Sequence, residues 1–232
     1  MMKKYKTATL ILIWIVLFVL LFVLLVAFLY NKYKPGYVFE NGTWNYISYD
    51  AAVGRRVKPI DVKKDEFRKL KYKNFARDNE SVYFKDYRIE GSDPETFEVI
   101  STANRRCYAK DKNFVYIYVR DGWDVYKVIN ADPETFEVLE FPYAKDKNDA
   151  YNGTLPLFVD DVSKFEVLEG GNMSTSTSAE GFLNDIAKTD EEFRYNNEKY
   201  GFVEDAVKYS EEGIAKTEKL VYEGYRLVED KR

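Results

Sequence analysis

The sequence predicts an all-β protein made of tandem β-hairpin repeats, preceded by one N-terminal transmembrane α-helix. Three observations lead to this fold class. A long apolar run lies near the N-terminus, aromatic residues make up 17 % of the 232 residues, and two short segments recur almost unchanged further along the chain. Aromatic and β-branched side chains favour strands, and recurring segments indicate an array of stacked units. We therefore expect a meander, solenoid or propeller-like arrangement.

The first element is the apolar run from Leu10 to Leu29, which contains twenty consecutive apolar residues. As a helix it would be about 30 Å long, the thickness of a bilayer's hydrocarbon core. We predict a membrane anchor over residues 8–30, after a short cytoplasmic tail at 1–7. The alternative of a cleaved signal peptide is less well matched, because such peptides have shorter apolar regions that end in small residues, and this run ends in VAFLYNK.

Lysines on the two sides of this run predict its orientation. Lys3, Lys4 and Lys6 precede it, whereas Lys32 and Lys34 follow it. Because positive charges are retained on the cytoplasmic side, we expect a cytoplasmic N-terminus and a single pass through the cell membrane. The bulk of the chain is then extracytoplasmic.

The region after the anchor begins with a basic stretch. Between Gly54 and Lys73 there are nine basic residues and three acidic ones, whereas the chain beyond Lys73 is acidic. The basic stretch could contact anionic lipid head groups or an acidic envelope polymer, and the alternative is a solvated strand surface. The net charge of −4 disfavours a nucleic-acid partner.

An internal repeat organises residues 31–170, most clearly over 72–170. The octapeptide DPETFEVI at 93–100 returns as DPETFEVL at 132–139, and YAKDKN occurs at 108–113 and again at 143–148. We expect structural roles for the signature positions of these two segments. They are Asp93, Pro94, Phe97, Tyr108, Asp111, Asn113, Asp132, Pro133, Phe136, Tyr143, Asp146 and Asn148.

Each unit is predicted to form strands, because its apolar residues alternate with a period of two. Val115, Ile117 and Val119 alternate with tyrosines, and Asp121-Gly122 follows as the turn of a hairpin. An Asp-Pro turn comes next, and its phenylalanine is expected on the apolar side of the sheet. One hairpin buries too little surface to be stable, so the copies must pack against one another.

The preceding unit, SVYFKDYRIEG, is shorter. Its alternation places Val82 and Phe84 opposite Tyr87 and Ile89.

The order of these segments resembles the bacterial DKNYY repeat family, named for its Asp-Lys-Asn-aromatic signature. The resemblance extends less clearly from Gly36 to Asp230. It implies a repeat-containing protein, of a kind often exported or membrane-attached, with no established activity, so it supplies no catalytic residue. The chain departs from the signature in FARDN at 75–79 and in AKT at 187–189 and 215–217.

The C-terminal part is predicted to hold degenerate terminal repeats at 182–232, after a flexible Gly/Ser/Thr linker at 171–181. Its periodicity allows two interpretations. A helical stripe could consist of Ile214, Thr217, Val221, Tyr225 and Val228, whereas the match between LVYEGYRLVED and SVYFKDYRIEG favours another hairpin.

Composition excludes several kinds of chemistry. The chain has no His and a single Cys, Cys107, so it cannot contain a histidine-based catalytic pair or an intramolecular disulfide. Cys107 is expected to be buried and inert, the alternative being an intermolecular disulfide. We predict no enzymatic activity, no cofactor and no metal.

Two alternatives for the acidic residues remain open. Asp111 and Asp146 could act as a carboxylate pair in glycoside hydrolysis. A hard cation could instead bind the loop that contains Asp146, Asn148, Asp149 and Asn152, although the spacing does not match an EF-hand.

The function predicted from these observations is a non-enzymatic binding module of the cell envelope, with an envelope protein or glycan as partner. Trp44, Trp123 and the tyrosines could stack on sugars, or they could pack across strands. The other candidates are a carboxylate-dependent hydrolase of envelope glycans and a structural spacer. Ligand and oligomeric state stay open.

Overall fold

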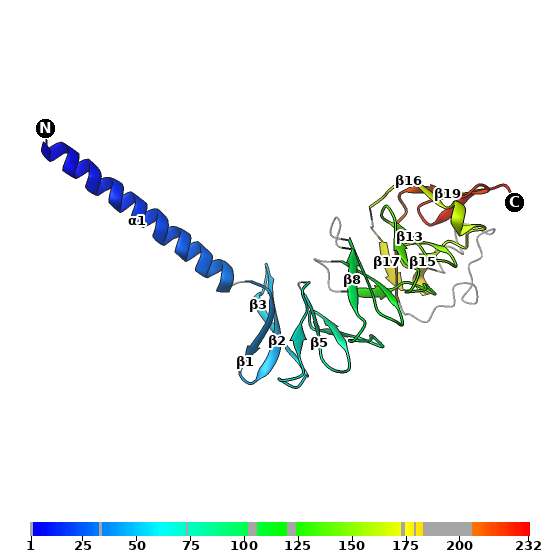
Figure 1. Cartoon of the computed structure of the whole chain (residues 1–232), viewed down its shortest axis with the longest axis horizontal. Coiled ribbons are helices and arrows are strands. Elements are labelled where there is room, and N and C mark those ends of the chain that lie inside the picture. Colours follow the sequence, from blue (N-terminus) through cyan, green and yellow to red (C-terminus); the bar gives the residue numbers. More distant parts are fainter. Residues whose placement is uncertain are drawn as a thin grey trace. The chain divides into compact units, whose positions relative to one another are not determined.

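A helix, α1 (Met2–Lys32), is followed by strands that form several small antiparallel sheets (Figure 1). The computed structural model describes residues 2–32, 34–72, 74–101, 106–119, 124–172, 175–178, 180–182 and 206–232. The all-β class with one N-terminal helix is therefore confirmed. The chain divides into two units, 1–65 and 66–232, at a boundary inside the stretch predicted as one repeat domain.

Helix α1 carries the apolar run. Its side chains are described for residues 13–29, and the large apolar ones among them are 40–72 % exposed. Within the described residues, no helix is long and apolar enough to cross a membrane. The predicted transmembrane span is thus not supported by this part of the structure.

The first unit also contains a three-stranded sheet in the order β1 (Gly36–Glu40), β2 (Thr43–Asp50) and β3 (Gly54–Ile60). The turn between β1 and β2 is Asn41-Gly42, and both residues have positive φ, as a two-residue hairpin loop requires. Trp44 packs edge-on against Phe39 and donates from Nε1 to the Lys64 carbonyl at 3.2 Å. The Trp44 side chain is therefore engaged inside this unit.

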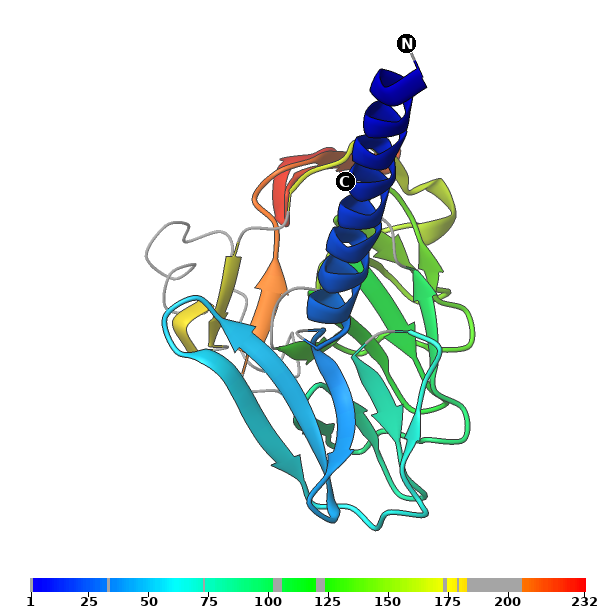
Figure 2. The same ribbon diagram turned by 90° about the vertical axis from the view of Figure 1, so that its left-hand side faces the viewer.

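The second unit consists mainly of four sheets, each with four antiparallel strands, which we number as repeat sheets one to four. Their strands are coloured from cyan through green to red in Figure 2. Sheet one contains β4 (Arg68–Lys69), β5 (Phe75–Arg77), β6 (Val82–Phe84) and β7 (Tyr87–Ile89). Sheet two contains β8 (Glu98–Ser101), β9 (Arg106–Lys110), β10 (Val115–Val119) and β11 (Val125–Lys127). Sheet three contains β12 (Glu137–Val138), β13 (Tyr143–Lys145), β14 (Ala150–Asn152) and β15 (Leu155–Pro156).

Sheet four contains β16 (Glu166–Glu169), β19 (Ile214–Lys216), β20 (Leu220–Glu223) and β21 (Arg226–Asp230). A short 3-10 helix, η2 (Val162–Lys164), precedes it. The C-terminal hairpin is therefore confirmed, and the helical stripe is wrong. Ile214, Val221 and Val228 of that stripe lie on three different strands, and Thr217 and Tyr225 lie between those strands and are buried.

Between β16 and β19 the chain makes a separate two-stranded ribbon of β17 (Thr175–Ser178) and β18 (Ala206–Tyr209). Strand β17 lies in the segment predicted as a flexible linker. Residues 183–205, with the AKT copy at 187–189, lie outside the described residues, as do the Asp121-Gly122 turn and Trp123.

Strand registers agree with the alternation read from the sequence. Val82 pairs with Ile89 and Phe84 with Tyr87 across β6 and β7. Tyr118 pairs with Val125 across β10 and β11. In sheets two and three, the first strand follows an Asp-Pro turn, and the Asp-Lys-Asn loop joins the second strand to the third.

The core lies between consecutive sheets, so inner strands are buried on both faces. On β10, Tyr116 and Tyr118 pack with sheet one, whereas Val115 and Ile117 pack with sheet three. All four side chains are at most 3 % exposed. This double burial explains why the strand alternates tyrosine with aliphatic residues rather than polar with apolar ones.

Candidate functional site: the Asp-Lys-Asn loops

The loop between β9 and β10 is organised by the buried carboxylate of Asp111. Its Oδ1 accepts hydrogen bonds from the backbone amides of Asn113 at 2.7 Å and Phe114 at 2.8 Å. Its Oδ2 accepts from the amide of Asp93 and the hydroxyl of Tyr116, both at 2.8 Å. One side chain thus closes its own loop and ties it to the turn that precedes sheet two.

Asp146 makes the same four bonds in the next repeat. Oδ1 accepts from the amides of Asn148 at 2.7 Å and Asp149 at 2.9 Å. Oδ2 accepts from the amide of Asp132 at 2.6 Å and from the hydroxyl of Tyr151 at 2.7 Å. The sequence repeat is therefore also a repeat of hydrogen bonds.

The Asp-Pro turn and the lysine of the next loop form a second link. Asp93 Oδ1 accepts from the Thr96 amide and hydroxyl, and its Oδ2 is 2.5 Å from Lys112 Nζ. The Thr96 hydroxyl in turn accepts from the Lys112 amide at 3.0 Å. The hydrogen bond from Lys112, followed by that from Thr96, lowers the pKa of Asp93 to about 2.

The following turn repeats this link. Asp132 accepts from the Thr135 amide and hydroxyl and lies 2.7 Å from Lys147 Nζ, while the Thr135 hydroxyl accepts from the Lys147 amide. Lys147 and Thr135 lower the pKa of Asp132 to about 2. The lysine of the signature therefore neutralises a carboxylate of its own repeat.

The phenylalanine after each turn lies between two aromatic rings. Phe97 is 5.3 Å from Phe75 of sheet one and 5.9 Å from Tyr116 of its own sheet, measured between ring centroids. Phe136 is likewise 5.5 Å from Tyr108 and 5.9 Å from Tyr151. The prediction that Phe97 and Phe136 occupy the apolar side is consistent with this packing.

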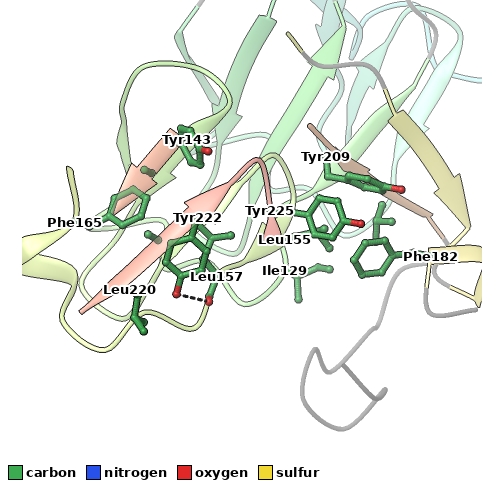
Figure 3. Close-up of a cluster of buried hydrophobic side chains, with 13 residues drawn as sticks. Ile129, Tyr143, Leu155, Leu157, Phe165, Phe182, Tyr209, Leu220, Tyr222 and Tyr225 are labelled. Atoms are coloured by element: carbon green, nitrogen blue, oxygen red, sulfur yellow. Dashed lines mark hydrogen bonds between the residues drawn. The ribbon is translucent and has the colours of Figure 1, made fainter. Parts of the chain in front are cut away.

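Sheet four continues the pattern. Phe165 lies 6.0 Å from Tyr143 of sheet three and 6.5 Å from Tyr222 (Figure 3). In that cluster the Tyr222 hydroxyl donates to the Leu157 carbonyl at 3.1 Å, the bond drawn in Figure 3. Aromatic contacts of this kind add about 0.5–1.5 kcal/mol each beyond the area they bury.

The two end copies depart from the signature in different ways. In FARDN, Asp78 closes its loop as Asp111 does, because it accepts from the amides of Glu80 and Ser81 and from the Tyr83 hydroxyl. The missing Lys-Asn pair therefore leaves the loop geometry intact.

In the AKT copy at 215–217, Thr217 replaces the aspartate. Its hydroxyl accepts from the amides of Lys219 and Leu220 and donates to Asp160 Oδ1 at 2.6 Å. In this copy the loop therefore supplies the hydrogen-bond donor and the turn supplies the carboxylate that accepts, the reverse of the regular copies.

Three of the four residues considered for a cation, Asp146, Asp149 and Asn152, accept hydrogen bonds from their own molecule. All oxygens of Asp146 accept internal bonds, and Asp149 accepts from the amides of Ala150, Phe158 and Val159. Asn152 Oδ1 accepts from the Ser210 amide. Among the described residues, no group of three or more His, Cys, Asp or Glu side chains has an arrangement that could hold a metal ion.

The carboxylates considered for glycoside hydrolysis are similarly occupied. Asp111 belongs to the loop of sheet two, and Asp146 and Asp149 belong to that of sheet three. Burial raises the pKa of Asp149 to about 6, against the opposing effect of its backbone hydrogen bonds. A raised pKa is common at catalytic sites, but here the carboxylate holds backbone amides of its own loop.

Several residues with a role in these loops were not singled out from the sequence. They include Tyr116 and Tyr151, each five residues after its aspartate, together with Thr96 and Thr135. The constant spacing of five is the signal that could have identified the tyrosines. The Cys107 backbone lies in β9, paired with Tyr118, and its side chain lies outside the described residues.

Comparison with known proteins gives a family match. A family model described as the DKNYY family matches residues 75–121 and 108–231. No curated protein and no solved structure matches the chain.

Proposed function

Because the chain belongs to the DKNYY family, and because its signature side chains are engaged in internal bonds, we propose that it is a membrane-anchored, extracytoplasmic repeat protein that acts as a non-enzymatic binding module of the cell envelope. The observation that carries this proposal is the use of the signature carboxylates. Asp111 and Asp146 each accept four hydrogen bonds from their own molecule. A carboxylate held in this way positions backbone, and it is poorly placed to transfer protons to a substrate.

The anchor is supported by the sequence and by the exposure of α1. The apolar run extends from Leu10 to Leu29, beyond the residues 13–29 whose side chains are described. Phe18 and Leu21, for example, are more than 70 % exposed, and the large side chains on every side of the described helix are uncovered. A helix apolar all round requires an apolar environment, which a bilayer supplies.

The anchor is tested by extraction and protease accessibility. Membranes carrying the full chain are washed at alkaline pH, and intact cells and spheroplasts are then treated with protease. We expect the chain to stay in the membrane pellet and to be digested in spheroplasts down to a protected N-terminal fragment. Release by the alkaline wash would contradict the anchor, and protection of residues 36–232 in spheroplasts would contradict the orientation.

The binding role is tested by crosslinking the full chain in intact cells and by co-sedimentation of the detergent-solubilised chain with purified cell-wall glycan. We expect one envelope component to be enriched reproducibly over a control protein fused to the same helix. Absence of enrichment in both assays would favour the structural spacer.

A further inference from the structure

The turn between β2 and β3 is an exposed apolar tip. It consists of Ala51, Ala52 and Val53, all exposed, and Val53 is 65 % exposed. Its backbone is held in place, because the amides of Ala52 and Val53 donate to Asp50 Oδ1 at 2.8 and 3.2 Å. Gly54 ends the turn with a φ of +77°, which glycine adopts without steric cost. The tip is therefore a defined structure that presents small apolar side chains to its surroundings.

Strand register places this tip at the end of the sheet where the chain arrives from α1. Gly36, the first residue of β1, pairs with Ile47, and β2 continues for three residues to Asp50 before the turn. The turn thus extends about 10 Å past the row of Gly36, at about 3.3 Å per residue. Since α1 ends at Lys32, the chain between it and Gly36 can span at most about 14 Å. The end of the sheet that carries the tip is consequently tethered close to the end of the helix.

Charged side chains flank the tip. Arg55 and Arg56 follow it on β3, and both are exposed. Arg56 Nη2 is 3.3 Å from Asp50 Oδ2, whereas the Arg55 side chain extends to Glu40 with a separation of 2.9 Å. Because both ion pairs are on the surface, they contribute little and lipid phosphates can compete for the arginines. Residues 50–56 hold one Asp and two Arg, so the segment keeps a net charge of +1.

We propose that the β2–β3 turn is a second membrane contact, with Val53 in the headgroup layer of an anionic bilayer and Arg55 and Arg56 beside lipid phosphates. This inference rests on the proposed membrane anchor. A small apolar tip flanked by basic residues suits the interface, where the apolar side chains leave water and the arginines meet negative charge. The contact would make the tip end of the β1–β3 sheet face the membrane.

The test uses the full chain with Cys107→Ser, reconstituted in vesicles of phosphatidylcholine and phosphatidylglycerol. A bimane label is attached at Val53→Cys or, as the matched control, at Asp61→Cys. Asp61 is exposed and follows Ile60 at the opposite end of the same strand. Lipids with a spin label at the headgroup quench bimane that lies at the interface. Circular dichroism and denaturant unfolding confirm that each variant folds as the parent does.

We expect quenching at position 53 to exceed that at position 61 several-fold, and to fall in vesicles of phosphatidylcholine alone. A second variant, Ala52→Asp combined with Val53→Cys, should lower the quenching, because a charged residue resists entry into the interface. Equal quenching at 53 and 61 in protein that resists an alkaline wash would overturn this inference alone. Protein that the wash releases would overturn the anchor as well.

Discussion

At the scale of single residues, the aspartate that opens each of the two regular Asp-Lys-Asn loops accepts four hydrogen bonds. Asp111 is 3 % exposed and accepts two amides of its own loop, one amide of the preceding turn and one tyrosine hydroxyl. Hydrogen bonds to a charged group contribute about 1.5–3 kcal/mol each, more than neutral ones. The signature therefore encodes a buried carboxyl group whose two oxygens together accept four hydrogen bonds.

Replacement of this aspartate by its amide should be costly. In Asp111→Asn, an amide NH2 group replaces one of the two carboxylate oxygens. This group faces either the amides of the loop or the amide of Asp93, and because all of these are hydrogen-bond donors, no bond can form there. We expect the free energy of unfolding to fall by about 2–4 kcal/mol, as measured by urea denaturation. Lys112→Ala, which removes the exposed partner of Asp93, is the control and should lower the stability far less, because an exposed ion pair contributes little. Equal losses in the two variants would contradict this role of Asp111.

Two kinds of carboxylate should give opposite dependences of stability on pH. Asp93 and Asp132 have pKa values lowered to about 2, so the stability they add is present above the unfolded value near 4 and is lost as pH falls toward 2. Asp149 has a pKa raised to about 6, so its folded form holds a proton that the unfolded chain has already released. Its contribution is present below pH 4 and is lost as pH rises through 6.

Asp149→Asn separates the second effect from the first. The variant loses an acceptor for the Phe158 amide, and it should be less stable than the parent at pH 4. Between pH 4 and 6 the stability difference should shrink by about 2–3 kcal/mol, because only the parent must ionise a buried carboxyl. Urea denaturation at several pH values checks this. A difference that stays constant would mean that Asp149 ionises as readily in the folded chain as in the unfolded one.

At the scale of elements, the repeat unit is a four-stranded sheet joined to its neighbour by a turn-to-loop link. In the two regular copies, the loop carboxylate accepts a hydrogen bond from the backbone amide of the turn aspartate, Asp93 or Asp132. The residue just before that aspartate is Ser92 in one copy and Ala131 in the other. In sheet four the residue at this position is Asp160, and it faces the hydroxyl of Thr217. Each link thus has one carboxylate at the contact.

The pairing of Thr217 with Asp160 in sheet four can be converted by mutation into the loop carboxylate and small turn residue of the regular copies. Thr217→Asp alone places a second carboxylate against Asp160 and should destabilise the chain by about 1–3 kcal/mol. Adding Asp160→Ala recreates the regular pair and should recover most of that loss. A double-mutant cycle measured by urea denaturation gives the coupling energy. Additive effects would show that the two positions do not act as a unit.

At the scale of the whole molecule, the chain combines an apolar helix, a small three-stranded sheet and a row of repeat sheets. Repeat sheets depend on their neighbours, because each core cluster takes side chains from consecutive sheets. The helix contributes none of the core residues described in those clusters. Changes in the helix should therefore alter membrane retention and leave the repeats folded.

A pair of substitutions near the middle of α1 tests this independence. Leu20→Arg with Leu21→Arg should release much of the chain during an alkaline wash, since each arginine at the bilayer centre costs about 2.5–3.5 kcal/mol. Leu29→Arg, near the end of the run, is the control and should be retained, because a terminal arginine reaches the interface. The near-ultraviolet circular dichroism of the repeats should match the parent in both. Equal retention would argue against insertion of the run.

Much of the repeat fold was predictable, because period-two alternation and exact duplication are local signals. They identified the pairing of Val82 with Ile89 and the hairpin nature of the C-terminal segment. The ribbon of β17 and β18 was not predicted, since Thr175–Ser178 lacks apolar alternation and pairs with a strand about thirty residues away. The partners of Asp111 were also missed in part, because the Asp93 amide is eighteen residues distant.

Residue order alone thus established the duplicated units, their strand periodicity, the apolar N-terminal run and the lack of histidine chemistry. These properties depend on local spacing and composition. Only the tertiary structure showed that Asp111 and Asp146 accept hydrogen bonds from their own molecule. It also showed that Phe97 and Phe136 each lie between aromatic rings of two sheets. The Ala51–Val53 turn lies at the same end of its sheet as the start of β1, which the strand register determined. Such facts depend on which strands pack together, and packing is set by contacts between residues far apart in the chain.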